Sequence, residues 1–218
     1  MIVVDLLSED FEDAGRYHDV TNPVALIWLI SFEQIRHRDP LAAEFLSFIA
    51  CVDPKDVPQS LLQPGPSRKD ETKAIGTLDA YSFISRQYAD WDLDIHLLVY
   101  LATRNWLRKE EQLAHWTEKA ITRLDVVIPN HNQQSRSGWT RYLRHAQYAL
   151  KSSINDKYGN ERTELVWKVG MCLNSDGRFN EVGVLTAENE NFHDEPRRGT
   201  PSYVSEHEQP REPAPESG

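Results

Sequence analysis

Three aspartates, Asp90, Asp92 and Asp94, alternate along a short segment in a pattern that could support chemistry. Carboxylates at this spacing could bind a divalent cation or act as an acid and base pair. In a strand, however, alternate residues share one face, and that face is most often solvated. The glycine-bearing spacing of an EF-hand loop is also missing. We therefore predict neither a metal site nor a catalytic pair here.

The chain also lacks the motifs that activate a nucleophile or bind a nucleoside triphosphate. No G-x-S-x-G segment occurs. A Walker A loop reads G-x-x-x-x-G-K-[ST], and the segment 65–69 contains a proline and lacks that spacing. We predict that the chain is not an enzyme and that it has no cofactor and no metal.

Charge and cysteine content restrict the compartment and the partners. The 218 residues have a formal net charge of −10, which repels nucleic-acid phosphates and anionic membrane surfaces. Cys51 and Cys172 lie far apart in apolar patterns, which predicts two buried thiols in a reducing compartment. The first residues lack the features of a signal peptide, and the longest apolar stretch, 23–32, is about half of a membrane span. We expect a cytoplasmic protein whose partners include neither membranes nor nucleic acids.

Helical periodicity dominates residues 22–108. Each of the first three predicted helices begins with a capping residue followed closely by a proline or an acid. These start signals are Asn22-Pro23, Asp39-Pro40, and Ser67 with Asp70. A hairpin of 82–86 with 92–95 follows, and His96 opens the next helix. Three helices, a hairpin and a helix are the order of a winged-helix module.

The remaining segments complete a mainly α fold class with one β-hairpin. Residues 1–21 are predicted to be a linker, 109–160 a connecting helical hairpin, and 161–183 the start of a helical repeat. The tail, 184–218, has eight acidic residues against three arginines and contains five prolines. Such a composition cannot offset its ordering entropy by burial, so we predict a disordered tail.

A family resemblance rests on five segments of the first region. These are residues 22–35, 39–46, 53–62, 96–99 and 102–107. They resemble the region that follows the nucleotide-binding core in fungal NB-ARC proteins of the STAND class. There, a winged helix follows the ATPase core and leads into tetratricopeptide or kinesin-light-chain-like repeats. The resemblance covers roughly residues 5–183 and implies a fragment without its P-loop core, either a truncated paralogue or an incomplete gene.

The same resemblance gives His96 a specific ancestry. A histidine at the start of the helix after the hairpin reaches the β-phosphate of bound ADP in this family, and His96 occupies that position. Leu97 stands where an acidic residue often follows. We interpret His96 as a vestigial ADP-phosphate sensor and expect no ADP contact by this chain alone; capping or packing is the alternative role.

Residues 167–181 resemble the first half of a tetratricopeptide repeat. Gly170, Gly177 and Phe179 fit the small mid-helix, turn and aromatic positions of the repeat. Because half a repeat cannot bury its own face, we expect this face to pack on helix 135–153 or to be covered in a weak homodimer. The predicted interaction residues are Leu165, Val166, Val169, Gly170, Leu173 and Phe179.

Three functions fit these observations. The first is a non-catalytic regulatory or protein-interaction fragment of an NB-ARC and tetratricopeptide-type signalling protein. The second is a subunit of a split nucleotide-switch ATPase that docks on a separate NB-ARC core. The third is a DNA-binding winged helix, although the helix that would read DNA, 67–81, has basic and acidic residues that cancel.

Overall fold

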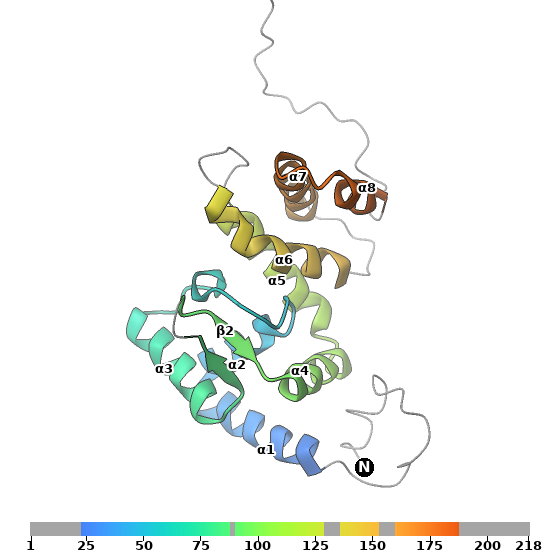
Figure 1. The fold of residues 1–218 in the computed structure, drawn as a ribbon. Helices are drawn as coiled ribbons and strands as arrows, with labels where there is room; N and C mark the ends of the chain where they lie inside the picture. Colours follow the sequence, from blue (N-terminus) through green and yellow to red (C-terminus); the bar gives the residue numbers. More distant parts are fainter. Residues whose placement is uncertain (1–22, 88–89, 129–135, 153–159, 188–218) are drawn as a thin grey trace, which may run out of the picture.

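The structure is a computed structural model that describes residues 23–87, 90–128, 136–152 and 160–187. These residues form eight α-helices, one short 3-10 helix and one two-stranded antiparallel sheet, which confirms the mainly α prediction (Figure 1). The elements are α1 (Pro23–Arg38), α2 (Pro40–Ile49), η2 (Gln59–Leu61), α3 (Arg68–Ala80), β1 (Ile84–Arg86), β2 (Leu93–Ile95), α4 (Leu97–Lys109), α5 (Leu113–Val127), α6 (Arg136–Ser152), α7 (Asn160–Ser175) and α8 (Phe179–Ala187). No helix in this part of the chain is both long and apolar enough to cross a membrane.

Two of the predicted helix starts are confirmed at atomic detail. Asp39 caps α2 by accepting the backbone N–H of Ala42 at 3.4 Å. Ser67 caps α3 by accepting the N–H of Asp70 at 3.2 Å. Each bond satisfies an N–H that has no partner inside the helix, so these boundaries follow from the local sequence.

The hairpin is anchored to the loop that follows α2. Ile84 pairs with Ile95 in an antiparallel register, and Val57 adds two backbone hydrogen bonds with Leu93, both of 2.8 Å. Strand β2 is therefore bonded on both edges, by β1 on one side and by the loop 53–57 on the other. This arrangement fixes the face that the hairpin presents to the rest of the molecule.

Helices α5 to α8 pack against one another in sequence. Helices α6 to α8 lie at the end of the molecule opposite α1, while α5 lies between them and the first helices and also packs against α2 and α4 (Figure 1). Helix α7 packs against α5, α6 and α8. Between α7 and α8 the chain turns at Gly177, whose φ of +75° favours glycine. One continuous set of buried side chains runs from α1 to α8.

The predicted start of the tail at residue 184 is too early, because α8 continues to Ala187. Leu185 is buried and joins the core, so burial compensates for the ordering of this last turn. Residues 1–21 and 188–218, which were predicted to be a linker and a disordered tail, lie outside the described residues.

Both cysteines are buried free thiols, as predicted. Burial raises the pKa of Cys51 and of Cys172 to about 11. A thiol with this pKa stays protonated at neutral pH and is a poor nucleophile.

Candidate functional site

The predicted interaction face of α7 is inside the protein. Leu165, Val169 and Leu173 have no exposed surface, and Val166 is 2% exposed. Their partners are α5, α6 and α8, so the expectation of packing back onto the chain is confirmed, with α5 as an additional partner. Gly170 is also buried. Phe179 is the exception, because 65% of it is exposed.

His96 lies at the surface, between β2 and α4. Its backbone N–H donates to the carbonyl of Phe83 at 3.0 Å, and its own carbonyl accepts from Tyr100 at 2.9 Å. The imidazole is exposed and makes no capping hydrogen bond. The next residue, Leu97, is 61% exposed. The backbone of His96 therefore joins the hairpin to α4, while its side chain is accessible to a partner.

Two of the three alternating aspartates are not solvated, which corrects the sequence-based expectation. Asp92 is buried and accepts a hydrogen bond of 2.6 Å from Arg141 on α6. Asp94 accepts the backbone N–H of Asp56 at 2.8 Å and pairs with Lys55 at 3.3 Å. Only Asp90 is exposed. Asp92 and Asp94 are held by charged side chains of other elements, Arg141 and Lys55. The alternation of aspartates in the sequence does not show where these partners are.

A further set of contacts extends this pairing to the loop 53–57. Arg144 on α6 bonds with Asp53 at 3.0 Å and also with Asp56. Gln87, just after β1, donates to Asp56 at 2.7 Å and to Asp94 at 3.3 Å. We call the whole cluster the polar seam, and it consists of Asp53, Asp56, Gln87, Asp92, Asp94, Arg141, Arg144 and His145. It joins the hairpin and the loop to α6.

His145 is the fully buried member of the polar seam. Its Nε2 lies 3.1 Å from the carbonyl oxygen of Asp56, which requires the Nε2–H tautomer because a carbonyl can only accept. Its Nδ1 is buried and has no hydrogen-bond partner among the described residues. Burial lowers the pKa of His145, more than the bond to Asp56 and the charge of Asp53 raise it. The imidazole is therefore neutral at physiological pH.

The pKa values of the two seam aspartates, Asp92 and Asp94, shift in opposite directions. Burial raises the pKa of Asp92, and the nearby Arg141 only partly opposes this. Burial also acts to raise the pKa of Asp94, but hydrogen bonds from Asp56, Gln87 and Lys55 together lower it. Asp94 is therefore the more firmly ionised of the two, and it organises the loop against the hairpin.

A second contact joins α4 to α6. The hydroxyls of Tyr100 and Tyr148 hydrogen-bond to each other, and the Arg104 guanidinium lies 5.7 Å and 5.6 Å from the two ring centres. Arg104 also donates to the carbonyl of Ala50 at 2.9 Å. Helix α6 is thus held by polar groups both at the seam and at α4.

The seam was not among the features predicted from the sequence, although the sequence contains a signal for it. Arg141, Arg144 and His145 have the i, i+3, i+4 spacing of one helix face, and acidic residues gather in 53–56 and 90–94. Their partners lie far apart in the chain, so the sequence does not show which face meets which loop. No cluster of three metal-ligating side chains occurs in the described part of the chain.

Similarity to a known fungal protein extends these observations. The chain is related to a region of a nucleotide-binding leucine-rich repeat (NLR)-like protein from Hyaloscypha variabilis, with 42% identity over 181 residues. The match covers 83% of this chain and 18% of the relative. The chain thus spans less than a fifth of that protein. No family model and no solved structure matches the chain.

Proposed function

We propose that this chain is a non-catalytic regulatory module of an NLR-like signalling protein. In this proposal residues 22–108 act as the winged helix that follows an NB-ARC core, and α5 to α8 lead toward tetratricopeptide-like repeats that bind other proteins. The chain's role is to couple the position of the hairpin to the position of those helices.

The polar seam is the observation that supports this coupling. Its ion pairs join Asp92, the residue just before β2, and the loop 53–57 to α6, and Arg141 and Arg144 keep 41% and 42% of their side chains exposed. The contact at Arg144 is directional because its two terminal nitrogens bind two different carboxylates, those of Asp53 and Asp56, at the same time. It is also more easily opened and re-formed than an apolar core, as interfaces between moving domains require.

Removing both arginines of the seam tests the coupling. We expect Arg141→Ala combined with Arg144→Ala to destabilise the chain by about 2 kcal/mol, after allowance for solvent screening. Hydrogen exchange should accelerate in α6 and also in the loop 53–57 and β2. The matched control is Arg136→Ala on the same helix, because Arg136 pairs with Asp176 outside the seam. Faster exchange that stays confined to α6 would contradict the coupling.

The runner-up function is that of a subunit that docks on a separate nucleotide-binding core. The exposed imidazole of His96 at the base of the hairpin favours it, since a buried side chain could not reach a nucleotide held by another protein. In that case His96 would contact the phosphates of ADP only in the complex.

Nucleotide assays separate catalysis from both proposals. We expect the purified chain to hydrolyse neither ATP nor GTP above background, because it contains no Walker A loop. Calorimetry with ADP should show no binding to the chain alone; under the runner-up function His96→Ala weakens ADP binding once a core is added. Turnover that persists through purification and disappears in a variant of this chain would overturn the non-catalytic assignment.

A further inference from the structure

A cavity of about 220 Å³ lies between α2, α3, α5 and the segment 59–64. Its floor consists of Phe45, Leu62 and Ile75, which belong to the buried core. The volume is below the roughly 300–1,000 Å³ of sites that enclose a drug-sized molecule. A single large apolar side chain suits it better.

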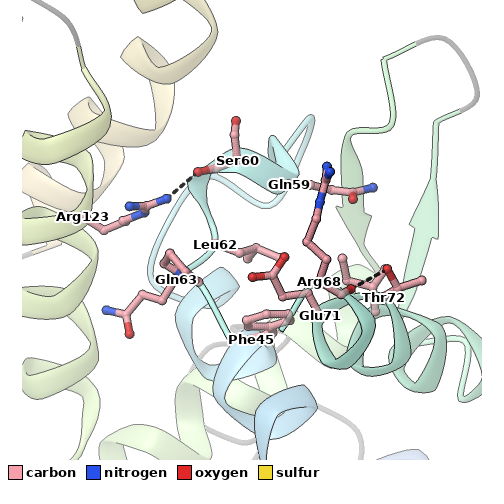
Figure 2. Close-up of a pocket in the computed structure, with 11 residues that line it drawn as sticks. Phe45, Gln59, Ser60, Leu62, Gln63, Arg68, Glu71, Thr72 and Arg123 are labelled. Carbon is pink, nitrogen blue, oxygen red and sulfur yellow. Dashed lines mark hydrogen bonds between the residues drawn. The ribbon is translucent and has the colours of Figure 1, made fainter. Parts of the chain in front are cut away.

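Two arginines lie on opposite sides of this cavity, with Leu62 and Phe45 between them (Figure 2). Arg123 is fixed by the carbonyls of Ser60 and Leu61, at 2.8 Å and 3.2 Å. A guanidinium has five N–H donors, so donors of Arg123 remain for a ligand.

Arg68, on the other side, is exposed at the start of α3. Within the described residues its guanidinium forms no hydrogen bond or ion pair. One acid, Glu71, also lines the cavity, and its Oε1 accepts the backbone N–H of Gly65 at 2.9 Å. Across the cavity there is thus a guanidinium on each side, Arg68 and Arg123, with an apolar floor between them and one carboxylate, that of Glu71, beside the floor. Such a pattern suits an apolar side chain with a carboxylate on each side.

We propose that this cavity binds a peptide segment with a central phenylalanine and an acidic residue two positions before it and two positions after it. The proposed occupant is residues 9–13 of this chain. The segment reads Glu9-Asp10-Phe11-Glu12-Asp13. In an extended peptide, residues two apart share one face. Glu9, Phe11 and Asp13 then face the cavity together, with Phe11 on the apolar floor and the two carboxylates at Arg68 and Arg123.

The length of the intervening chain allows this contact. Nine residues, 14–22, separate the segment from α1, and they span up to about 30 Å when extended. Helix α1 has 16 residues and is about 24 Å long. It packs against α2, which supplies Phe45 to the cavity. The segment can therefore return along α1 to the site.

A second segment has the same pattern, with Phe192 between Glu190 and Asp194. Only residues 188–189 separate it from the end of α8. Helix α8 packs against α7, and neither helix contributes a residue to the cavity. For this reason we assign the site to residues 9–13.

A labelled peptide of residues 7–15 tests the site. The receptor is the full chain carrying Phe11→Ala, so that its own segment does not compete. We expect saturable binding by fluorescence polarisation, about tenfold weaker when Arg68→Ala is added. The neighbouring Lys69→Ala is the control and should leave binding unchanged. The wild-type chain should bind the peptide about tenfold more weakly than the Phe11→Ala receptor does, because residues 9–13 already occupy the site.

A second measurement is independent of the arginine variant. The side-chain amide signals of Gln59 and Gln63, which also line the cavity, should shift on peptide addition in an NMR titration. Absence of saturable binding, equal binding with and without Arg68, or equally tight binding of a peptide of residues 188–196 would overturn the assignment. The inference goes beyond the proposed function, and its failure would leave the hydrogen-exchange test of the seam unaffected.

Discussion

Replacing Leu173 with aspartate is expected to remove most of the stability of the chain. Leu173 has no exposed surface and lies in the core where α7 meets its neighbouring helices. Loss of a buried leucine side chain costs about 2–5 kcal/mol, and an unpaired buried carboxylate adds to this cost. The sum, about 5 kcal/mol or more, approaches the whole stability of a typical domain. Urea unfolding followed by circular dichroism measures it.

Phe179→Asp is the matched control for this experiment. Phe179 belongs to the same predicted interaction set but is 65% exposed, so its replacement should change stability by less than about 1 kcal/mol. Sedimentation at several concentrations adds a second readout. The buried face of α7 can support a homodimer only if the stack of α5 to α8 opens. A stable, folded Leu173→Asp chain would contradict the packing described here.

Acid should destabilise the chain through His145 before most carboxylates titrate. The pKa of His145 is lowered in the folded state, so below the unfolded value of about 6.5 the unfolded chain binds more protons. Stability is therefore full above this pH and is lost as the pH falls toward the folded pKa, by at most about 1.4 kcal/mol per pH unit. Unfolding free energies measured between pH 7.5 and 5 test this slope.

His145→Gln isolates the contribution of the histidine. Glutamine can still donate a hydrogen bond to the carbonyl of Asp56 but does not titrate. The other seam groups, Asp92 and Asp94 with their shifted pKa values, are present in both proteins and cancel in the comparison. We expect the slope between pH 6.5 and 5 to be smaller in the variant. Equal slopes in the two proteins would show that His145 does not control the acid response of the seam.

Together these experiments distinguish two ways in which α6 and α7 are held. Helix α7 is held by apolar burial, so a single charge in its core is expected to disrupt the stack. Helix α6 meets the hairpin through charges and through one neutral buried imidazole, so pH and arginine substitution are expected to act there. Under the proposed regulatory function this difference matters, because a polar contact can open without exposing an apolar core.

Features set by local contacts could be read from the sequence. The caps Asp39 and Ser67 bond to N–H groups three residues away, so the helix starts were predicted correctly. The hairpin, the glycine turn at Gly177 and the mainly α class also follow from short-range patterns. The apolar stripe of α7 was visible at helical spacing, since its period depends only on the helix itself.

The tertiary structure decided which residues pack against the apolar stripe of α7 and which residues pair with the aspartates. The stripe of α7 did not reveal that α5 would cover it, and the alternating aspartates did not reveal that Arg141 and Lys55 would bind them. Arg144 and its partners Asp53 and Asp56 are 91 and 88 positions apart. Contacts at such separations depend on how whole helices pack, and a charge has the same sequence pattern whether it faces water or a partner. The sequence by itself therefore determined the elements of this protein, while packing decided that charges far apart in the chain pair with one another and join the hairpin to the helices that follow.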